Sequence, residues 1–118
     1  EATAERWKIW SAPEHWDAAA VRARLEREYV RSFDPAAVTR QLAAILASGS
    51  RAEALPSVTA PTLVIHGLAD TLVKPDGGRR TAELIPGAKL LEIPDMGHEL
   101  PEAHWDTVLD AVEAHTGA

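Results

Sequence analysis

The 118-residue sequence predicts an α/β fold in which an all-helical first half precedes alternating strands and helices. Residues 1–55 carry apolar residues at helical spacing between capping signals. Residues 56–118 contain two short apolar runs, each followed by a helical stripe. This β-α-β-α order implies parallel strands joined by right-handed crossovers.

The first helix of the N-terminal half is predicted to begin after Asp17, whose carboxylate suits the N-cap position. It would run to about Phe33, with Val21, Leu25 and Tyr29 on one face. We therefore expect this face to pack inward.

A second helix is predicted to begin at Asp34-Pro35, because proline at the first helical position loses no useful N–H. Ser48-Gly49 is expected to end it. Its apolar stripe consists of Val38, Leu42, Ile45 and Leu46. The stretch from Ser50 to Leu55 is expected to form one more short helical turn.

The second half is predicted to hold two parallel strands. The run from Thr62 to His66 lies between proline and glycine, which is typical of a strand buried on both faces. A helix from Gly77 to Ile85, with Ala82 and Ile85 inward, would lead to a strand from Lys89 to Ile93. The last helix would span Pro101 to His115, with a stripe of Trp105, Val108, Leu109 and Val112. Two strands do not form a stable sheet alone, so we expect sheet partners outside these residues.

Composition limits the possible partners. The net charge is −6, and residues 56–118 carry all of it, with four Lys/Arg and ten Asp/Glu. An acidic half repels phosphate, so nucleic acid is not an expected partner.

No apolar run approaches the roughly 18 residues of a membrane helix, no signal peptide is recognised, and cysteine is absent. We expect a cytoplasmic protein without membrane contact, and the initial Glu1 suggests a processed or cut end.

Two polar residues follow the predicted strands. Asp70 lies four residues after His66, in a loop where Gly67 permits a sharp turn. His98 follows Gly97 in the loop after the second strand. The carboxyl ends of parallel strands share one sheet edge, so the two side chains are expected within roughly 2.6–3.2 Å. Histidine can act as a general base and aspartate can orient it, although a turn aspartate and a surface histidine are common alternatives.

Other titratable residues are weaker candidates. Asp95 and Glu99 are rival acids, but they share the loop of His98, which makes pairing with its far ring nitrogen awkward. His66 is expected to be a structural residue. His15, His104 and His115 are expected at the surface. The sequence has no zinc-hydrolase string and no nucleotide-binding glycine string, so we expect neither a metal nor a cofactor.

The tryptophans fall into two groups. Trp105 belongs to a helical stripe and is expected in the core. Trp7, Trp10 and Trp16 cluster near the start of the chain. They are expected either to pack against the half of the enzyme that lies outside these residues or to line an acyl or aromatic substrate pocket.

Residues 50–118 resemble the C-terminal part of α/β-hydrolases, nearest to the esterase and methylesterase-like branch. The resemblance rests on Ala60-Pro61-Thr62-Leu63-Val64-Ile65-His66-Gly67 with Asp70, on Ile85-Pro86-Gly87-Ala88, and on Met96-Gly97-His98-Glu99-Leu100-Pro101. Many relatives have proline after the acid, where this chain has Thr71. Residues 1–49 are loosely similar to a helical cap. The implied division is a cap-like segment at 1–55 and the C-terminal β-α-β-α part of the hydrolase core at 56–118.

The resemblance implies an acyl hydrolase that cleaves a small-molecule ester without a cofactor, with Asp70 and His98 in a Ser-Asp-His triad. None of the five serines lies in a G-x-S-x-G string, so the nucleophile is expected on an N-terminal half of the same enzyme. The chain alone is expected to be inactive. Dehalogenases, epoxide hydrolases and haloperoxidases share this fold, and a non-catalytic fragment that completes a partner chain is a further alternative.

Overall fold

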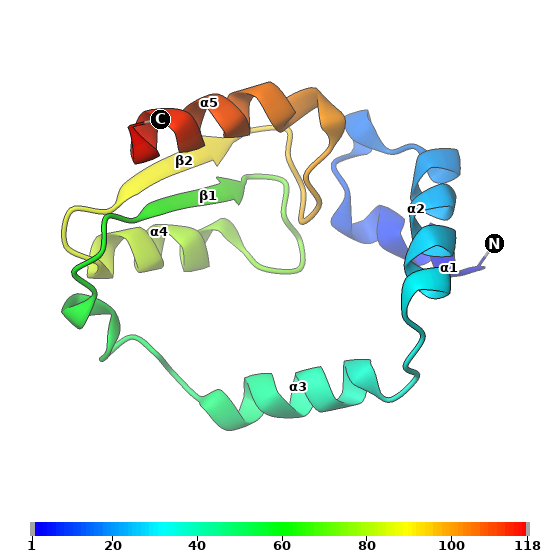
Figure 1. Cartoon of the computed structure of the whole chain (residues 1–118), viewed down its shortest axis with the longest axis horizontal. Coiled ribbons are helices and arrows are strands. Elements are labelled where there is room, and N and C mark those ends of the chain that lie inside the picture. The colour runs from blue at the N-terminus through cyan, green and yellow to red at the C-terminus, as the bar shows by residue number, and fades with distance from the viewer. Residues whose placement is uncertain (1, 118) are drawn as a thin grey trace.

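The computed structural model describes residues 2–117, and side chains from residue 5 onward. The N-terminal part is helical throughout (Figure 1). Its elements are α1 (Ala2–Trp7), the short 3₁₀ helices η1 (Lys8–Trp10) and η2 (Pro13–His15), α2 (Ala18–Arg31), α3 (Ala37–Ser48) and η3 (Leu55–Ser57). None of the helices in the described part is both long enough and apolar enough to cross a membrane.

The start of α2 follows the predicted capping. One carboxylate oxygen of Asp17 accepts hydrogen bonds from the backbone N–H groups of Ala19 and Ala20, at 2.8 and 3.0 Å. These bonds satisfy donors that have no partner within the helix. Val21 on this helix is buried, whereas Tyr29 is exposed, so only the first part of the predicted face packs inward.

Helix α3 begins later than the sequence predicted. The carboxylate of Asp34 accepts a hydrogen bond from the Ala36 N–H at 3.0 Å, which favours a turn before the helix starts at Ala37. The helix ends at Ser48, as predicted, and Gly49 has a φ of 61°. The expected turn between Ser50 and Leu55 is present, because the Ala54 and Leu55 N–H groups donate to the Arg51 carbonyl at 3.0 and 3.2 Å, and η3 (Leu55–Ser57) follows it.

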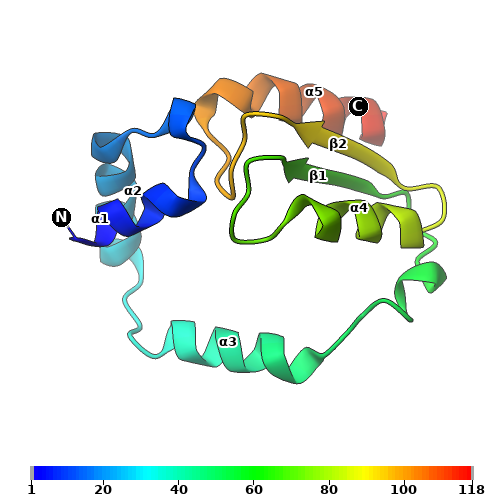
Figure 2. The same cartoon turned by 180° about the vertical axis from the view of Figure 1, so that it is seen from behind.

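The C-terminal part contains the two predicted parallel strands: β1 (Leu63–Gly67) lies one residue later than predicted, and β2 (Lys89–Ile93) has the predicted bounds. Their register pairs Leu63 with Lys89 and Gly67 with Ile93, so both strands end at the same level. Helix α4 (Pro75–Leu84) connects them, and η4 (Glu102–His104) leads into α5 (Trp105–Thr116). Helices α4 and α5 lie on opposite sides of the strands in both views (Figures 1 and 2).

The core of the described residues is small. Its buried apolar residues are Ala12, Val21, Ile85, Ile93 and Met96. Ile85 is therefore inward, as expected. Most of β1 is only half-buried, which corrects the prediction of a strand buried on both faces. The correction follows from the single neighbouring strand in the described residues.

Two predicted apolar stripes are exposed. On α3, Val38, Leu42, Ile45 and Leu46 are all exposed, and this helix lies apart from the strands in both views (Figures 1 and 2). On α5, Trp105 is 49% exposed, which corrects its expected place in the core. The period of a stripe shows which residues share a face, but another element must cover that face to bury it.

Candidate active site

The turn after β1 brings the Asp70 backbone against the loop that follows β2. The Leu68 N–H donates to the Ile93 carbonyl at 2.9 Å, and the Ala69 N–H donates to the Met96 carbonyl at 3.0 Å. A Cβ at Gly67 would lie 2.1 Å from the Met96 carbonyl oxygen. Only glycine permits this close approach. The two loops are therefore held together by their backbones at the carboxyl edge of the strands.

The Asp70 carboxylate is buried, and both of its oxygens have hydrogen-bond partners. It is 8% exposed, and its Oδ1 accepts hydrogen bonds from the N–H groups of Leu72 and Val73, at 2.8 and 2.9 Å. Burial raises the pKa of Asp70, but the Val73 N–H, the His98 ring and the Leu72 N–H together outweigh burial and lower the pKa below its ordinary value of 3.8. Asp70 is therefore an ionised acceptor at neutral pH.

The His98 ring faces this carboxylate. Its Nδ1 lies 2.9 Å from Asp70 Oδ2, which confirms the predicted proximity of the two side chains. An ionised carboxylate can only accept, so the hydrogen bond requires the proton on Nδ1. In the neutral ring, Nε2 is then left as a proton acceptor. The His98 side chain is 39% exposed, so this acceptor belongs to an accessible ring.

The two rival acids have other partners. Asp95 Oδ2 lies 2.8 Å from His15 Nε2. The Glu99 carboxylate accepts from Arg24 at 2.7 Å and from the Ser11 hydroxyl at 3.1 Å. In the described residues, Asp70 is thus the carboxylate bonded to His98.

His66 has a supporting position beside the pair. Its Nε2 lies 2.8 Å from the Val73 carbonyl oxygen and 3.7 Å from Asp70 Oδ2. The ring bonds to the same turn that supplies N–H donors to Asp70. This arrangement agrees with the predicted structural role of His66.

The expected surface positions of His15 and His104 are wrong. Both side chains are largely covered, with 21% and 11% exposed, and their rings meet edge to face at a centroid distance of 4.8 Å. They surround the carboxylate of Asp95. The sequence contains no local signal for this cluster, because its members come from segments up to 89 positions apart.

The three N-terminal tryptophans are half-buried. Trp7 and Trp10 contact each other edge to face, with ring centroids 5.2 Å apart. The Arg24 guanidinium lies 4.9 Å from the centroid of the Trp7 ring. Trp7 and Trp10 therefore use at least part of their surface for packing within the N-terminal helical segment (residues 5–55, here called the helical segment). A substrate-binding role for Trp7, Trp10 and Trp16 stays a prediction.

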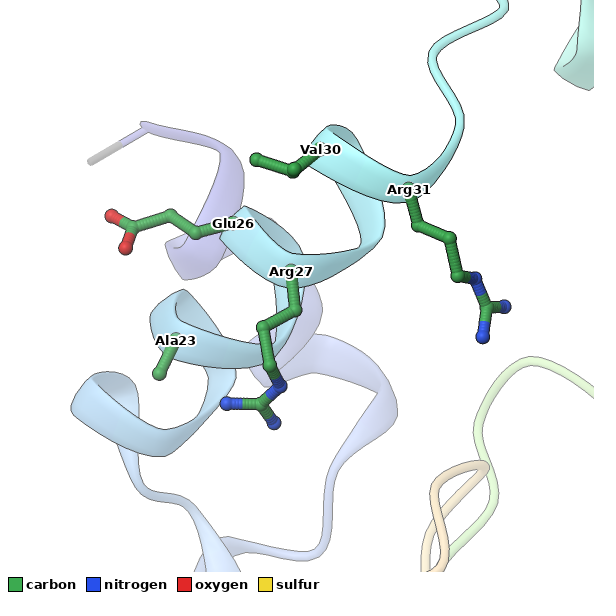
Figure 3. A pocket seen from close by; sticks show the side chains of 5 residues that line it. All are labelled: Ala23, Glu26, Arg27, Val30 and Arg31. Carbon is green, nitrogen blue, oxygen red and sulfur yellow. The ribbon is translucent and has the colours of Figure 1, made fainter.

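A separate open hollow lies along α2 (Figure 3). Its lining comes from one helix and consists of Ala23, Glu26, Arg27, Val30 and Arg31. Neither Asp70 nor His98 lines this hollow, so it does not mark the proposed site of chemistry.

The match with known proteins agrees with this geometry. Residues 7–104 match the alpha/beta hydrolase fold family, and the chain belongs to that family. The expected fold is thereby confirmed, with two parallel strands flanked by helices.

Individual relatives are esterases. The chain is 33% identical to rhodomycin D methylesterase DnrP from Streptomyces peucetius, over all of this chain and 40% of that protein. It is 41% identical to rhodomycin D methylesterase DauP from Streptomyces sp. (strain C5), over 58% of this chain and 23% of the relative. It is 33% identical to bifunctional esterase/perhydrolase DCH from Acinetobacter calcoaceticus, over 48% of this chain and 21% of that protein. The chain thus spans at most about two fifths of the length of these relatives.

Proposed function

We propose that this chain supplies the acid and the histidine of a Ser-Asp-His triad in a carboxylic-ester hydrolase. The observation that carries the proposal is the 2.9 Å contact between His98 Nδ1 and Asp70 Oδ2, in two loops that leave neighbouring parallel strands. In the hydrolases with this fold, the chain order is serine, acid, histidine. Asp70 and His98 follow that order, and the serine would come from a segment outside these residues.

The proposed chemistry gives His98 the proton transfers and Asp70 a supporting role. His98 Nε2 takes the proton of the serine hydroxyl as its oxygen attacks the ester carbonyl. Asp70 holds the ring orientation and stabilises the imidazolium that forms. The imidazolium then returns the proton to the leaving alkoxide, which gives an alcohol and an acyl-serine. Water, deprotonated by His98 as it attacks, then breaks the acyl-serine bond; the acid is released and His98 returns the proton to the serine oxygen.

The names of the relatives suggest the kind of ester. Two of the similar proteins are rhodomycin D methylesterases, so we propose a methyl ester of a small molecule as the substrate. Residues 1–55 would form a cap-like segment over residues 56–118, and Trp7, Trp10 and Trp16 are the candidates to contact an aromatic or acyl group. The remaining substrate pocket would lie on the partner half of the same enzyme.

The test compares the full-length protein with residues 1–118 alone. We expect the full-length protein to hydrolyse an activated methyl ester and to react with a fluorophosphonate at a serine preceding this chain. Residues 1–118 alone should do neither, because their five serines lie outside a G-x-S-x-G string. Labelling of one of those five serines, or a full-length protein inert to both probes, would contradict the proposal. The second result would favour a non-catalytic role.

A further inference from the structure

A second cluster of ionisable side chains lies near the loop of His98 but shares no residue with the Asp70–His98 pair. It combines His15 of η2, Asp95 of the loop after β2 and His104 of η4. One nitrogen or oxygen from each residue lies within 4.8 Å of the others. His15 therefore meets two residues from the far end of the sequence, and together they present two imidazoles and one carboxylate to one another.

The contacts within the cluster leave one group unsatisfied. His15 Nε2 and Asp95 Oδ2 lie at hydrogen-bonding distance, 2.8 Å. His104 Nε2 lies 3.3 Å from Asp95 Oδ1, but their geometry does not form a hydrogen bond. This nitrogen is shielded from solvent and has no hydrogen-bond partner. A shielded polar atom without a partner requires an explanation, and a bound metal ion is one that fits a histidine nitrogen.

We propose that His15, Asp95 and His104 bind a divalent transition-metal ion, with Zn²⁺ as the best-suited ion. Zinc sites that keep an open position commonly use two histidines and a carboxylate, with water as the fourth ligand. The lone pair of His104 Nε2 would then have a partner. The carboxylate of Asp95 would balance part of the metal charge.

The distances come near this coordination and reach it if the three side chains adjust. Metal–ligand bonds of about 2.0–2.2 Å in a tetrahedral site place the ligand atoms roughly 3.3–3.6 Å apart. His15 Nε2 lies 2.8 Å from Asp95 Oδ2 and His104 Nε2 lies 3.3 Å from Asp95 Oδ1, while all the ligand atoms of the cluster lie within 4.8 Å of one another. Binding one ion therefore requires the carboxylate to turn and the two rings to approach a common point. The imidazole rings stand at 82° to each other, so they do not stack and both can direct Nε2 toward the same carboxylate. Asp95 is 47% exposed, which gives an ion and a water molecule access.

The position of the cluster indicates a structural role. A bound ion would tie η2 and η4 to the loop that begins after β2 and carries His98 three residues beyond Asp95. It would therefore fix the helical segment against the C-terminal part. This inference does not depend on the proposed esterase activity, because its ligands differ from Asp70 and His98.

The test is metal binding by the full-length protein after dialysis against a chelator. Calorimetric titration with Zn²⁺ should show one saturable site, and Co²⁺ should give visible absorption typical of a nitrogen- and oxygen-bound tetrahedral ion. Asp95→Asn and His104→Gln should each weaken Zn²⁺ binding by at least about 100-fold. Zn²⁺ should raise the melting temperature of the unsubstituted protein, since an ion that binds only the folded state stabilises it.

Two control variants define the location of the site. His115→Gln removes a histidine outside the cluster, and His98→Ala removes the ring of the proposed triad; both should bind Zn²⁺ as the unsubstituted protein does. Circular dichroism checks that each variant is folded, and His15→Gln serves if His104→Gln does not fold. Absence of a saturable site would overturn the proposal and leave a purely hydrogen-bonded cluster. Equal binding by Asp95→Asn, or loss of binding in His98→Ala, would overturn it as well.

Discussion

The backbone N–H of His98 donates a hydrogen bond to the carbonyl oxygen of Trp10, at 2.7 Å. This bond joins the end of η1 to the loop after β2, across 88 positions of the sequence. The approach is close because Gly97 has no side chain: a Cβ there would lie 2.3 Å from the same carbonyl oxygen. The helical segment therefore takes part in placing the His98 ring beside Asp70.

Gly97→Ala should disturb this placement. The added methyl group cannot fit against the Trp10 carbonyl, so the loop with His98 must move away from the helical segment. A displacement of about 1 Å at a catalytic group lowers turnover by roughly 100-fold. We expect a loss of that order in kcat/KM of the full-length protein toward a methyl ester.

The matched control is Gly77→Ala, which adds the same methyl group within α4. There the new Cβ would meet only Val73 Cγ1, at an ordinary 3.7 Å. Alanine also favours the helix by about 0.5–1 kcal/mol over glycine. We expect full activity and a slightly higher melting temperature; equal losses in both variants would contradict a specific role for the Trp10–His98 contact.

Asp70 and His98 should behave as one catalytic unit. His98→Ala removes the base, and Asp70→Asn keeps the shape but favours the wrong ring tautomer, at a cost on the order of 10⁴ in turnover. Because members of a triad act together, the double variant should lose far less than the product of the two single losses. Steady-state kinetics on the full-length protein measures this, with circular dichroism as a folding check. Near-normal turnover in folded Asp70→Asn would remove Asp70 from the mechanism.

The Asp70–His98 contact could be predicted because it depends on topology. Two parallel strands that end in register bring their following loops to one edge, and the sequence indicates both strands and both loops. The sequence also indicates that Gly67 occupies a sharp turn. In the structure, glycine is required there because a side chain would collide with the Met96 carbonyl oxygen. Backbone pairing between the loops then leaves little freedom for the two side chains.

The contacts of His15 and Glu99 could not be predicted in the same way. Each joins the helical segment to the loop after β2, and the relative position of these parts depends on tertiary packing. Likewise, the spacing on α5 groups Trp105 with Leu109 and Val112, all three of which are exposed, while Ala111 and His115 outside that stripe are half-buried. Nothing in the local pattern shows which face a neighbour covers. Local periodicity predicts elements and faces, while contacts between distant segments need the assembled fold.

The ionised state of Asp70 should contribute stability that depends on pH. Its pKa in the folded protein lies below 3.8, because hydrogen bonds outweigh the opposing effect of burial. Below about pH 4 the unfolded chain therefore binds more protons than the folded chain, so stability rises with pH in this range. The contribution is complete well above pH 4 and is lost as the pH falls through the folded pKa.

Asp70→Asn should consequently flatten the acid side of the stability profile. Urea unfolding of the full-length protein at several values between about pH 6 and pH 3 gives the free energy of unfolding at each. The unsubstituted protein should lose stability more steeply than Asp70→Asn over the acid part of this range. Parallel profiles would show that Asp70 has the same pKa in both states.

Glu99 should anchor the helical segment more strongly than a surface ion pair would. Its side chain is 14% exposed, and it accepts bonds from Arg24 on α2 and from Ser11. Glu99→Gln keeps the size but removes the charge from these bonds, and we expect a loss of about 1–3 kcal/mol in the free energy of unfolding.

The comparison for Glu99 is Glu83→Gln, which alters the exposed pair of Arg80 and Glu83 on α4. A solvent-exposed pair contributes about 0–1 kcal/mol, so this variant should be almost unchanged in urea unfolding at low salt. Raising the ionic strength should reduce the small effect of Glu83→Gln further but leave most of the effect of Glu99→Gln, because a largely buried pair is screened less. If both variants lose the same stability and respond equally to salt, the Glu99 contacts do not anchor the helical segment.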